Sequence, residues 1–529
     1  MVDVTEKPAL SGLDDLNEFE HALVDAARTG TTLEFRGSDV VDPVEISGWN
    51  HTIRAQLLRE LVLGRRGPVD PRGVRANGFR IVGVLDLDNV DACAGMKLTE
   101  CHFTEMVTAW NARLPWLDLS SSELPGFRGD LSEIEAGLWL NGAVIVGAGR
   151  GGAIDLTGTT IRGPLDLSNA RVANESGVAI RAVGLDVSGD LSMSGAELSG
   201  FGSRGAVQLF RAHIGGVLVM RSTRITNSAG KAVHAGQLRV DGNLRCEGAK
   251  ISGDNEVGGA LSLLGAYIGG DAMFLNSEIL NRSGLALDLE HAEVVGKIFL
   301  VRRGLCPRSD GETCKKSAFI DLNGFKFGAL ESSPGEPVAW QDWLHIIRYH
   351  TKSYRPGPYQ VLASSERSAG HDGNARRILI AQQKDIHQRA PHALGSWLAR
   401  CSHRLWGVLA GYGYLARRTA VALVFAMVTV GALGVWAGRV ADGRHHVAER
   451  VISFGSSYGQ PCSVIELVGL GLDRGLPLAS TGVRARCDLN PDTNWAAAFT
   501  IVIWLLQAAI WGLATLALAG YTGLVRKPT

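Results

Sequence analysis

Apolar residues in the middle of this chain recur every five or six positions. In one stretch they fall at Leu156, Ile161, Leu167 and Val172. This spacing is too long for the simple alternation of a strand, and it does not fit the 3.6-residue period of a helix. It favours a coil with four short faces, each of which turns an aliphatic residue inward. We therefore predict a mainly β protein with a quadrilateral β-solenoid over residues 79–330.

Glycine marks the length of the repeat. The recurring glycines lie 26 to 28 residues apart and are Gly137, Gly163, Gly189, Gly216, Gly242, Gly270 and Gly296. A constant period between 20 and 50 residues is the signature of a solenoid. We therefore expect a coil period of about 26 residues. A glycine at a corner supplies either a positive φ or room for a close backbone approach, so we expect valine there to damage the coil.

The coils resemble pentapeptide-repeat proteins and related quadrilateral β-helices, although the five-residue A-(D/N)-L-x-x phrase is kept only loosely. A longer resemblance, covering most of the chain, is to bacterial membrane proteins with the same three parts in the same order. These parts are Ile53–Leu58 leading to Val82–Leu87, then the coils, then a juxtamembrane segment from Tyr359 to Ala381. Such proteins are commonly labelled "membrane-associated oxidoreductase" or "pentapeptide repeat protein". The resemblance therefore implies a membrane-bound solenoid and, by its label, a redox activity.

The segments on both sides of the coils have helical patterns. Residues 13–28 and 53–62 each place apolar residues on one face and stop before a glycine, so residues 1–78 are expected to form a helical cap on the solenoid. Residues 331–395 are expected to hold a linker at 332–337 and a helix hairpin at 358–389 that turns at 369–373. Tryptophans, tyrosines and arginines mix over residues 396–418, which suits a helix in the membrane interface.

Two uncharged apolar stretches follow. Residues 419–437 and 495–521 are each long enough to cross a hydrocarbon layer of about 30 Å, and we expect them to be transmembrane helices. Eight basic residues and one acid lie between Arg376 and Arg418, and Arg526 and Lys527 follow the second stretch. Basic residues close to spans stay inside. The first residues lack the pattern of a cleaved signal.

The charges and spans together predict a multi-pass protein of the cell membrane with both termini in the cytoplasm. Residues 438–494 would form an extracytoplasmic loop, and residues 522–529 a cytoplasmic tail.

The cysteines divide according to these compartments. Cys462 and Cys487 are the cysteines of the outside loop, where an oxidising space favours a disulfide, with two unpaired thiols as the alternative. Cys306 and Cys314 flank a charged loop, and we expect reduced thiols there, with a metal or redox pair as the alternative. A third group is expected to fill the coil interior and consists of Cys93, Cys101 and Cys246.

One motif imitates a cofactor site. Gly147, Gly149 and Gly152 spell G-x-G-x-x-G after an apolar run. A dinucleotide-binding motif needs a helix after its last glycine, whereas the residues that follow here predict the next coil. We therefore interpret the motif as a corner loop and expect no cofactor-binding, metal or catalytic residues. His445 and His446 are interpreted as part of a solvated loop, with a metal site completed by Asp442 or Glu449 as the alternative.

Composition adds little about partners, because 53 basic residues balance 53 acidic ones. We expect no nucleic-acid partner. The sequence favours a non-enzymatic scaffold held at the lipid bilayer, with an unknown protein partner on the solenoid faces. An oxidoreductase is the alternative. A third class, a channel or transporter subunit, would need a homo-oligomer through the transmembrane helices around Gln507.

Overall fold

The structure is a computed structural model of the 529-residue chain. It describes residues 16–35, 51–147, 149, 151–256, 258–300, 319–333, 336–337, 340–414, 416–443, 445–451, 460–476, 482–491 and 493–521. The prediction for Cys306 and Cys314 lies outside these residues. The chain divides into two units, Met1–Asn374 and Ala375–Thr529, each of which is described by itself.

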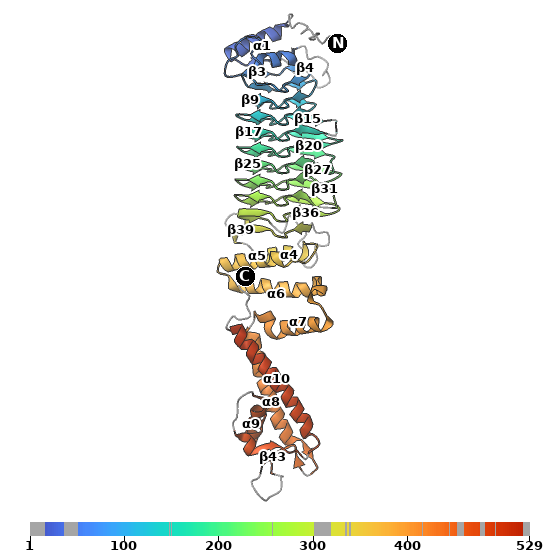
Figure 1. The fold of residues 1–529 in the computed structure, drawn as a ribbon, viewed down its shortest axis with the longest axis vertical. Coiled ribbons are helices and arrows are strands. Elements are labelled where there is room, and N and C mark those ends of the chain that lie inside the picture. Colours follow the sequence, from blue (N-terminus) through green and yellow to red (C-terminus); the bar gives the residue numbers. More distant parts are fainter. Residues whose placement is uncertain are drawn as a thin grey trace, which may run out of the picture. The chain divides into compact units, whose positions relative to one another are not determined.

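The first unit contains the predicted quadrilateral β-solenoid (Figure 1). One coil has four short strands, β17 (Thr160–Ile161), β18 (Leu165–Asp166), β19 (Arg171–Asn174) and β20 (Val178–Arg181). Each pairs in parallel with the corresponding strand of the next coil, β21 (Asp186–Val187), β22 (Leu191–Ser192), β23 (Glu197–Gly200) and β24 (Val207–Gln208). Successive coils therefore stack in register.

The strands gather into three sheets. The A sheet holds two faces of the coil, β17, β18, β21 and β22 together with β1 (Leu33–Glu34), β3 (Val74–Asn77), β6 (Met96–Thr99), β9 (Arg113–Leu114), β10 (Leu117–Asp118), β13 (Glu133–Ile134), β14 (Leu138–Trp139), β25 (His213–Ile214), β26 (Leu218–Val219), β29 (Arg239–Val240), β30 (Leu244–Arg245), β33 (Tyr267–Ile268), β34 (Ala272–Met273), β37 (Glu293–Phe299), β39 (Lys326–Ser333) and β40 (Glu336–Pro337). The B sheet holds β19 and β23 with β2 (Thr52–Arg54), β4 (Arg80–Val82), β7 (His102–Phe103), β11 (Glu123–Leu124), β15 (Val144–Gly147), β27 (Arg224–Asn227), β31 (Lys250–Gly253) and β35 (Glu278–Asn281). The C sheet holds β20 and β24 with β5 (Leu85–Asp86), β8 (Val107–Thr108), β12 (Phe127–Arg128), β16 (Gly152–Asp155), β28 (Val233–His234), β32 (Gly259–Ser262), β36 (Leu285–Asp288) and β38 (Phe319–Asp321).

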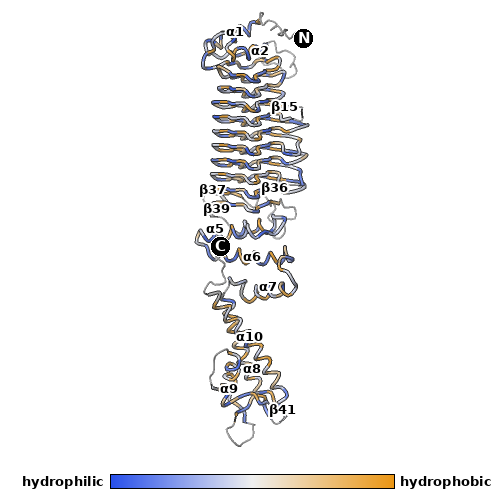
Figure 2. The backbone as a smooth tube through the Cα atoms, in the orientation of Figure 1, coloured by the Kyte–Doolittle hydropathy of each residue, from blue (hydrophilic) through white to orange (hydrophobic). Residues whose placement is uncertain are grey.

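The core runs along the axis of the coils, and hydrophobic and hydrophilic positions alternate around each turn (Figure 2). The four predicted inward residues, Leu156, Ile161, Leu167 and Val172, are at most 1% exposed. Cys101 and Cys246 are buried as predicted.

The prediction for Cys93 is wrong, because this residue is exposed. It lies in the turn before β6, with its sulfur near Gly64 rather than inside a coil. Cys93 therefore points away from the coil axis. The spacing of the apolar positions did not show that this residue lies in a turn.

The recurring glycines form a ladder. The amide of Gly189 donates to the carbonyl oxygen of Gly163 at 3.2 Å, and Gly216, Gly242 and Gly270 continue the series at 2.9–3.0 Å. Among the seven glycines, only Gly137 has a positive φ. A Cβ at Gly163 would collide with the carbonyl oxygen of Ala136, and one at Gly242 would lie 2.6 Å from that of Gly216. Close approach of stacked backbones, and not a positive φ, is therefore the reason for glycine at these positions.

Helices lie at both ends of the solenoid (Figure 1). Helix α1 (Glu18–Thr29) begins with a capping box of Asn17 and Glu20 and ends at Gly30, which has a φ of 69°. Helix α2 (Ala55–Val62) is shorter than predicted, because Ile53 belongs to β2. At the other end are α4 (Trp340–Tyr349) and α5 (Pro356–Ser368). The predicted linker at 332–337 is wrong in part, since the end of β39 and β40 pair there as an antiparallel hairpin.

The second unit holds the remaining helices. Helix α6 (Asp372–Arg389) begins at the boundary and is followed by η1 (Pro391–Leu394), α7 (Trp397–Ala410), η2 (Gly411–Gly413), α8 (Ala416–Arg439), α9 (Val464–Gly475), η3 (Val483–Ala485) and α10 (Ala496–Tyr521). Helices α8 and α10 are long and apolar enough to cross a membrane. Between them lie two small antiparallel sheets. One pairs β41 (Ala441–Asp442) with β42 (His445–His446), and the other pairs β43 (Ala448–Arg450) with β44 (Cys487–Leu489).

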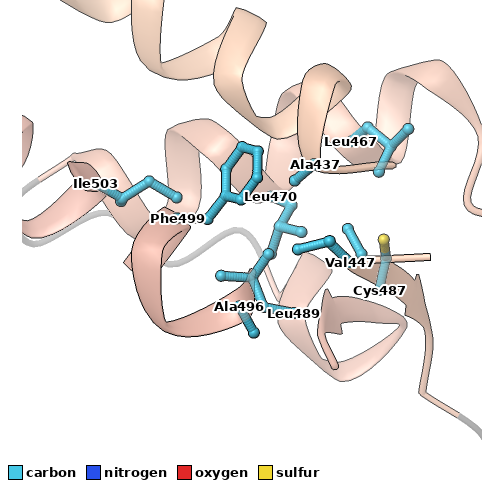
Figure 3. Close-up of a cluster of buried hydrophobic side chains, with 10 residues drawn as sticks. Ala437, Val447, Leu467, Leu470, Cys487, Leu489, Ala496, Phe499 and Ile503 are labelled. Atoms are coloured by element: carbon cyan, nitrogen blue, oxygen red, sulfur yellow. The ribbon is translucent and has the colours of Figure 1, made fainter. Parts of the chain in front are cut away.

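A small core joins these elements. Leu467 and Leu470 of α9, Leu489 of β44 and Phe499 of α10 point toward one another (Figure 3). The predicted disulfide between Cys462 and Cys487 is present, with a Cα–Cα distance of 6.2 Å, and it ties the start of α9 to β44.

His445 and His446 were expected in a solvated loop, but the structure places them in a short strand. These residues form strand β42, and His445 Nδ1 lies 3.5 Å from a carboxylate oxygen of the fully buried Glu449. Glu449 also accepts a hydrogen bond from the backbone amide of His446. Among the described residues, no group of three or more His, Cys, Asp or Glu side chains could hold a metal ion.

Candidate functional site

The C sheet carries one polar side chain per coil at the same register position. Strand register places Arg181 beside Gln208, Gln208 beside His234, and His234 beside Ser262. The same register brings Asp155 before this series and Asp288 after it. A short loop connects each B-sheet strand to the next C-sheet strand. These corner loops border the polar row on one side.

A groove lies where two of these corner loops meet the polar row. Its volume is about 630 Å³, and it is lined by Thr157, Ser176, Gly177, Val178, Arg181, Val183, Phe201, Gly202, Ser203, Arg204 and Gln208. Phe201 is 52% exposed, although it is an aromatic residue. Aromatic and arginine side chains are enriched at protein-binding surfaces, and this groove has both. We call this feature the C-sheet groove.

The loop that carries Phe201 is held by its neighbours. The Phe201 amide donates to the carbonyl oxygen of Gly177 at 2.8 Å. The side-chain amide of Asn227, from the next coil, donates to the carbonyl oxygen of Gly202 at 2.7 Å and to that of Lys231 at 2.5 Å. The backbone of Phe201 and Gly202 is thus hydrogen-bonded to the coils on both sides, and anchoring of this kind lowers the entropy that the loop loses on binding.

The charged side chains that line the groove are basic. Its lining, all of which is described, contains Arg181 and Arg204 and no acidic residue. Arg181 Nη1 lies 3.5 Å from an oxygen of Asp155, whereas Arg204 is exposed on the loop. Burial, together with the positive charges of Lys231 and Arg204, lowers the pKa of the neighbouring His234 to about 4. His234 is therefore neutral at pH 7, and the surrounding charge comes from the basic side chains.

Further along the row, the polar groups are bound to one another. Ser262 Oγ donates to Asp288 at 3.1 Å, and both residues are buried. Burial raises the pKa of Asp288. A serine nucleophile would instead have to donate to a general base such as His234. Ser262 and Asp288 are therefore not accessible to a ligand. The accessible part of the row is the groove at Arg181 and Phe201.

The three glycines of the G-x-G-x-x-G motif lie beside this region but do not line the groove. Gly147 ends β15, and Gly152 begins β16. A strand therefore follows the last glycine, as the interpretation of a corner loop requires. Asn174 donates to the carbonyl oxygens of Gly149 and Gly151 at 3.0 and 2.9 Å. The loop carbonyls are thus bonded to the next coil.

A second cavity of about 230 Å³ lies between the last coil and the start of α5. Acidic Glu256 and Asp321 line it together with basic Lys352 and Arg355. Its mixed charge gives no preference for one sign of ligand.

Sequence reasoning did not identify the C-sheet groove. The available signal was the loop 201–205, Phe-Gly-Ser-Arg-Gly, because it places an aromatic and a basic residue between two glycines at a coil corner.

Comparisons with protein-family models, with curated proteins and with solved structures found no match to this chain.

Proposed function

We propose that this protein is a membrane-anchored scaffold whose solenoid recognises a protein partner through the C-sheet groove. The observation that carries the proposal is the pairing of an exposed aromatic ring, Phe201, with the arginines Arg181 and Arg204 in a lining without acids. Aromatic and arginine residues are the side chains that dominate protein-binding surfaces. The partner is an acidic peptide segment, because its carboxylates complement the exposed Arg204.

Membrane anchoring is the second part of the proposal. Helices α8 and α10 supply two apolar segments of sufficient length. Basic residues gather before α8 and after α10, which supports a multi-pass arrangement with both termini in the cytoplasm. The disulfide between Cys462 and Cys487 supports an outside position for the segment between the helices. A solenoid anchored in this way would hold its partner at the inner face of the cell membrane.

The resemblance to membrane-bound pentapeptide-repeat-like proteins is consistent with this arrangement, and membership of that group is part of the proposal. The oxidoreductase activity that the resemblance implies stays a prediction. A flavin or nicotinamide absorption spectrum in the purified protein would support it.

The experiment that tests the proposal compares charge-reversal variants of the full chain. After crosslinking in membranes, the wild-type protein should capture a partner that Arg204→Glu loses. The matched control is Lys250→Glu, which makes the same charge change at an exposed position on the B sheet. The crosslinked segment of the partner should be acidic. Equal capture by Arg204→Glu and wild type, or a crosslinked segment without acids, would refute recognition by the groove.

A further inference from the structure

Helix α9 lies directly against the C-terminal half of α8. A Cβ added at Gly434 would collide with the carbonyl oxygen of Leu467, and one added at Gly471 would collide with that of Val430. The two backbones therefore approach through small residues. This is the packing by which helices associate inside membranes, where lipid provides no hydrophobic driving force.

The two helices run in opposite directions. Leu467 lies beside Gly438 near the end of α8, whereas Gly475 lies beside Val430. Trp436 is 59% exposed and lies three residues before Arg439, the basic residue that ends α8, so this end of the span is at the interface between membrane and water. Val430 precedes Trp436 by six residues and so lies about 9 Å deeper in the span, at 1.5 Å per residue. The C-terminal end of α9 is thus level with the interior of the span.

A separate cluster places the end of α9 at the same depth. Leu476, which directly follows α9, packs against the cluster formed by Ala426, Val430 and Ile510. These residues belong to α8 and α10. The end of α9 therefore lies at the depth of the membrane-spanning parts of α8 and α10.

The charges at this end of α9 are paired within the protein. Asp473 is 2% exposed, and Arg484 Nε lies 3.1 Å from its carboxylate. Arg474 Nε donates to a carboxylate oxygen of Asp488 at 2.8 Å. Ionised side chains at membrane depth occur where they are paired in this way. The pairs remove the main electrostatic cost of bringing this end of α9 below the interface.

Three apolar side chains in the first half of α9 are exposed, and one of them, Val468, lies beside Gly431 at the edge of the contact with α8. Val464 is 59% exposed, Ile465 is 85% exposed and Val468 is 36% exposed. We propose that α9 is a half-membrane helix whose C-terminal end enters the extracytoplasmic leaflet, with Val468 in contact with lipid acyl chains and Val464 and Ile465 nearer the interface. This inference rests on the membrane anchoring proposed above, and its partner is the lipid bilayer.

Spin-label accessibility of the full chain in liposomes of phosphatidylcholine tests the proposal. Single cysteines are introduced at Ile465 and Val468, in a background in which the cysteines outside the disulfide are replaced. Phe425, 73% exposed on α8, provides the lipid control, and Lys250 on the solenoid provides the aqueous control. The proposal predicts that the Val468→Cys label, compared with the Lys250→Cys label, is more accessible to oxygen and less accessible to a water-soluble nickel complex. The Ile465→Cys label should lie at a shallower depth.

The controls separate the two proposals. If the Phe425→Cys label is reached by the nickel complex as readily as the Lys250→Cys label, the membrane anchoring itself fails. If Phe425→Cys reports lipid while both α9 labels behave like Lys250→Cys, the half-membrane helix is refuted and the anchoring stands. Ile465 is 85% exposed, so a cysteine there disturbs no packing. If the Val468 variant misfolds, an Ile465→Cys label that is as accessible to the nickel complex as the Lys250→Cys label still refutes the half-membrane helix.

Discussion

At the scale of single residues, glycine has two separate roles in this solenoid. The recurring glycines, such as Gly163 and Gly242, sit where stacked backbones leave no room for a Cβ. The left-handed corners are at other positions, some held by glycine, such as Gly158 and Gly184, and some by asparagine, such as Asn169. The sequence revealed the period of the first group. It did not distinguish the two roles, because both favour the same residue.

The close backbone contact at the recurring glycines predicts that even a methyl group, as in alanine, destabilises the solenoid. Gly242→Ala should lower the stability of the full chain by about 1–3 kcal/mol, because the methyl group would force two coils apart. The measurement is the apparent midpoint of thermal unfolding by circular dichroism. Gly151→Ala is the matched control, since a Cβ there meets no atom within 4 Å and should leave the midpoint unchanged. Equal midpoints for both variants would contradict the role of close approach.

At the scale of elements, the sequence predicted most of the fold. The five- to six-residue apolar spacing identified four strands per coil, and the two apolar stretches correspond to α8 and α10. The errors fall where local signals conflict with tertiary pairing. Ser332–Ser333 reads as linker but ends β39, which pairs with β37 of the preceding coil and with β40. The loop that carries Phe201 was missed for a related reason, since its importance depends on the register of neighbouring coils.

The disulfide makes the prediction at this scale. In a variant that keeps only Cys462 and Cys487, a maleimide polymer should add no tag to the denatured protein before reduction and two tags after it. Removing the bond with Cys462→Ser and Cys487→Ser should cost the segment between α8 and α10 about 3 kcal/mol in the chain-entropy model. Faster proteolysis of that segment, compared with a Cys401→Ser control, would report the loss. Two tags without reduction would show that the bond does not form in the cell.

At the scale of the whole molecule, each unit has its own task in the proposed function. The solenoid supplies a stiff surface, because each coil is bonded to the next through four parallel strand pairings. The second unit supplies the apolar helices for the membrane. The proposed function depends on recognition by the C-sheet groove.

Photocrosslinking from the groove tests that claim most directly. A benzoylphenylalanine replaces Phe201 in the full chain in living cells, and the control replaces Leu280, an apolar residue of the B sheet that is 47% exposed. If the groove binds the partner, position 201 should crosslink to an acidic segment of one protein, and position 280 should not. Adding Arg204→Glu should abolish the crosslink from position 201. The same crosslinked partner from both positions, or a crosslink that persists with Arg204→Glu, would contradict recognition by the groove.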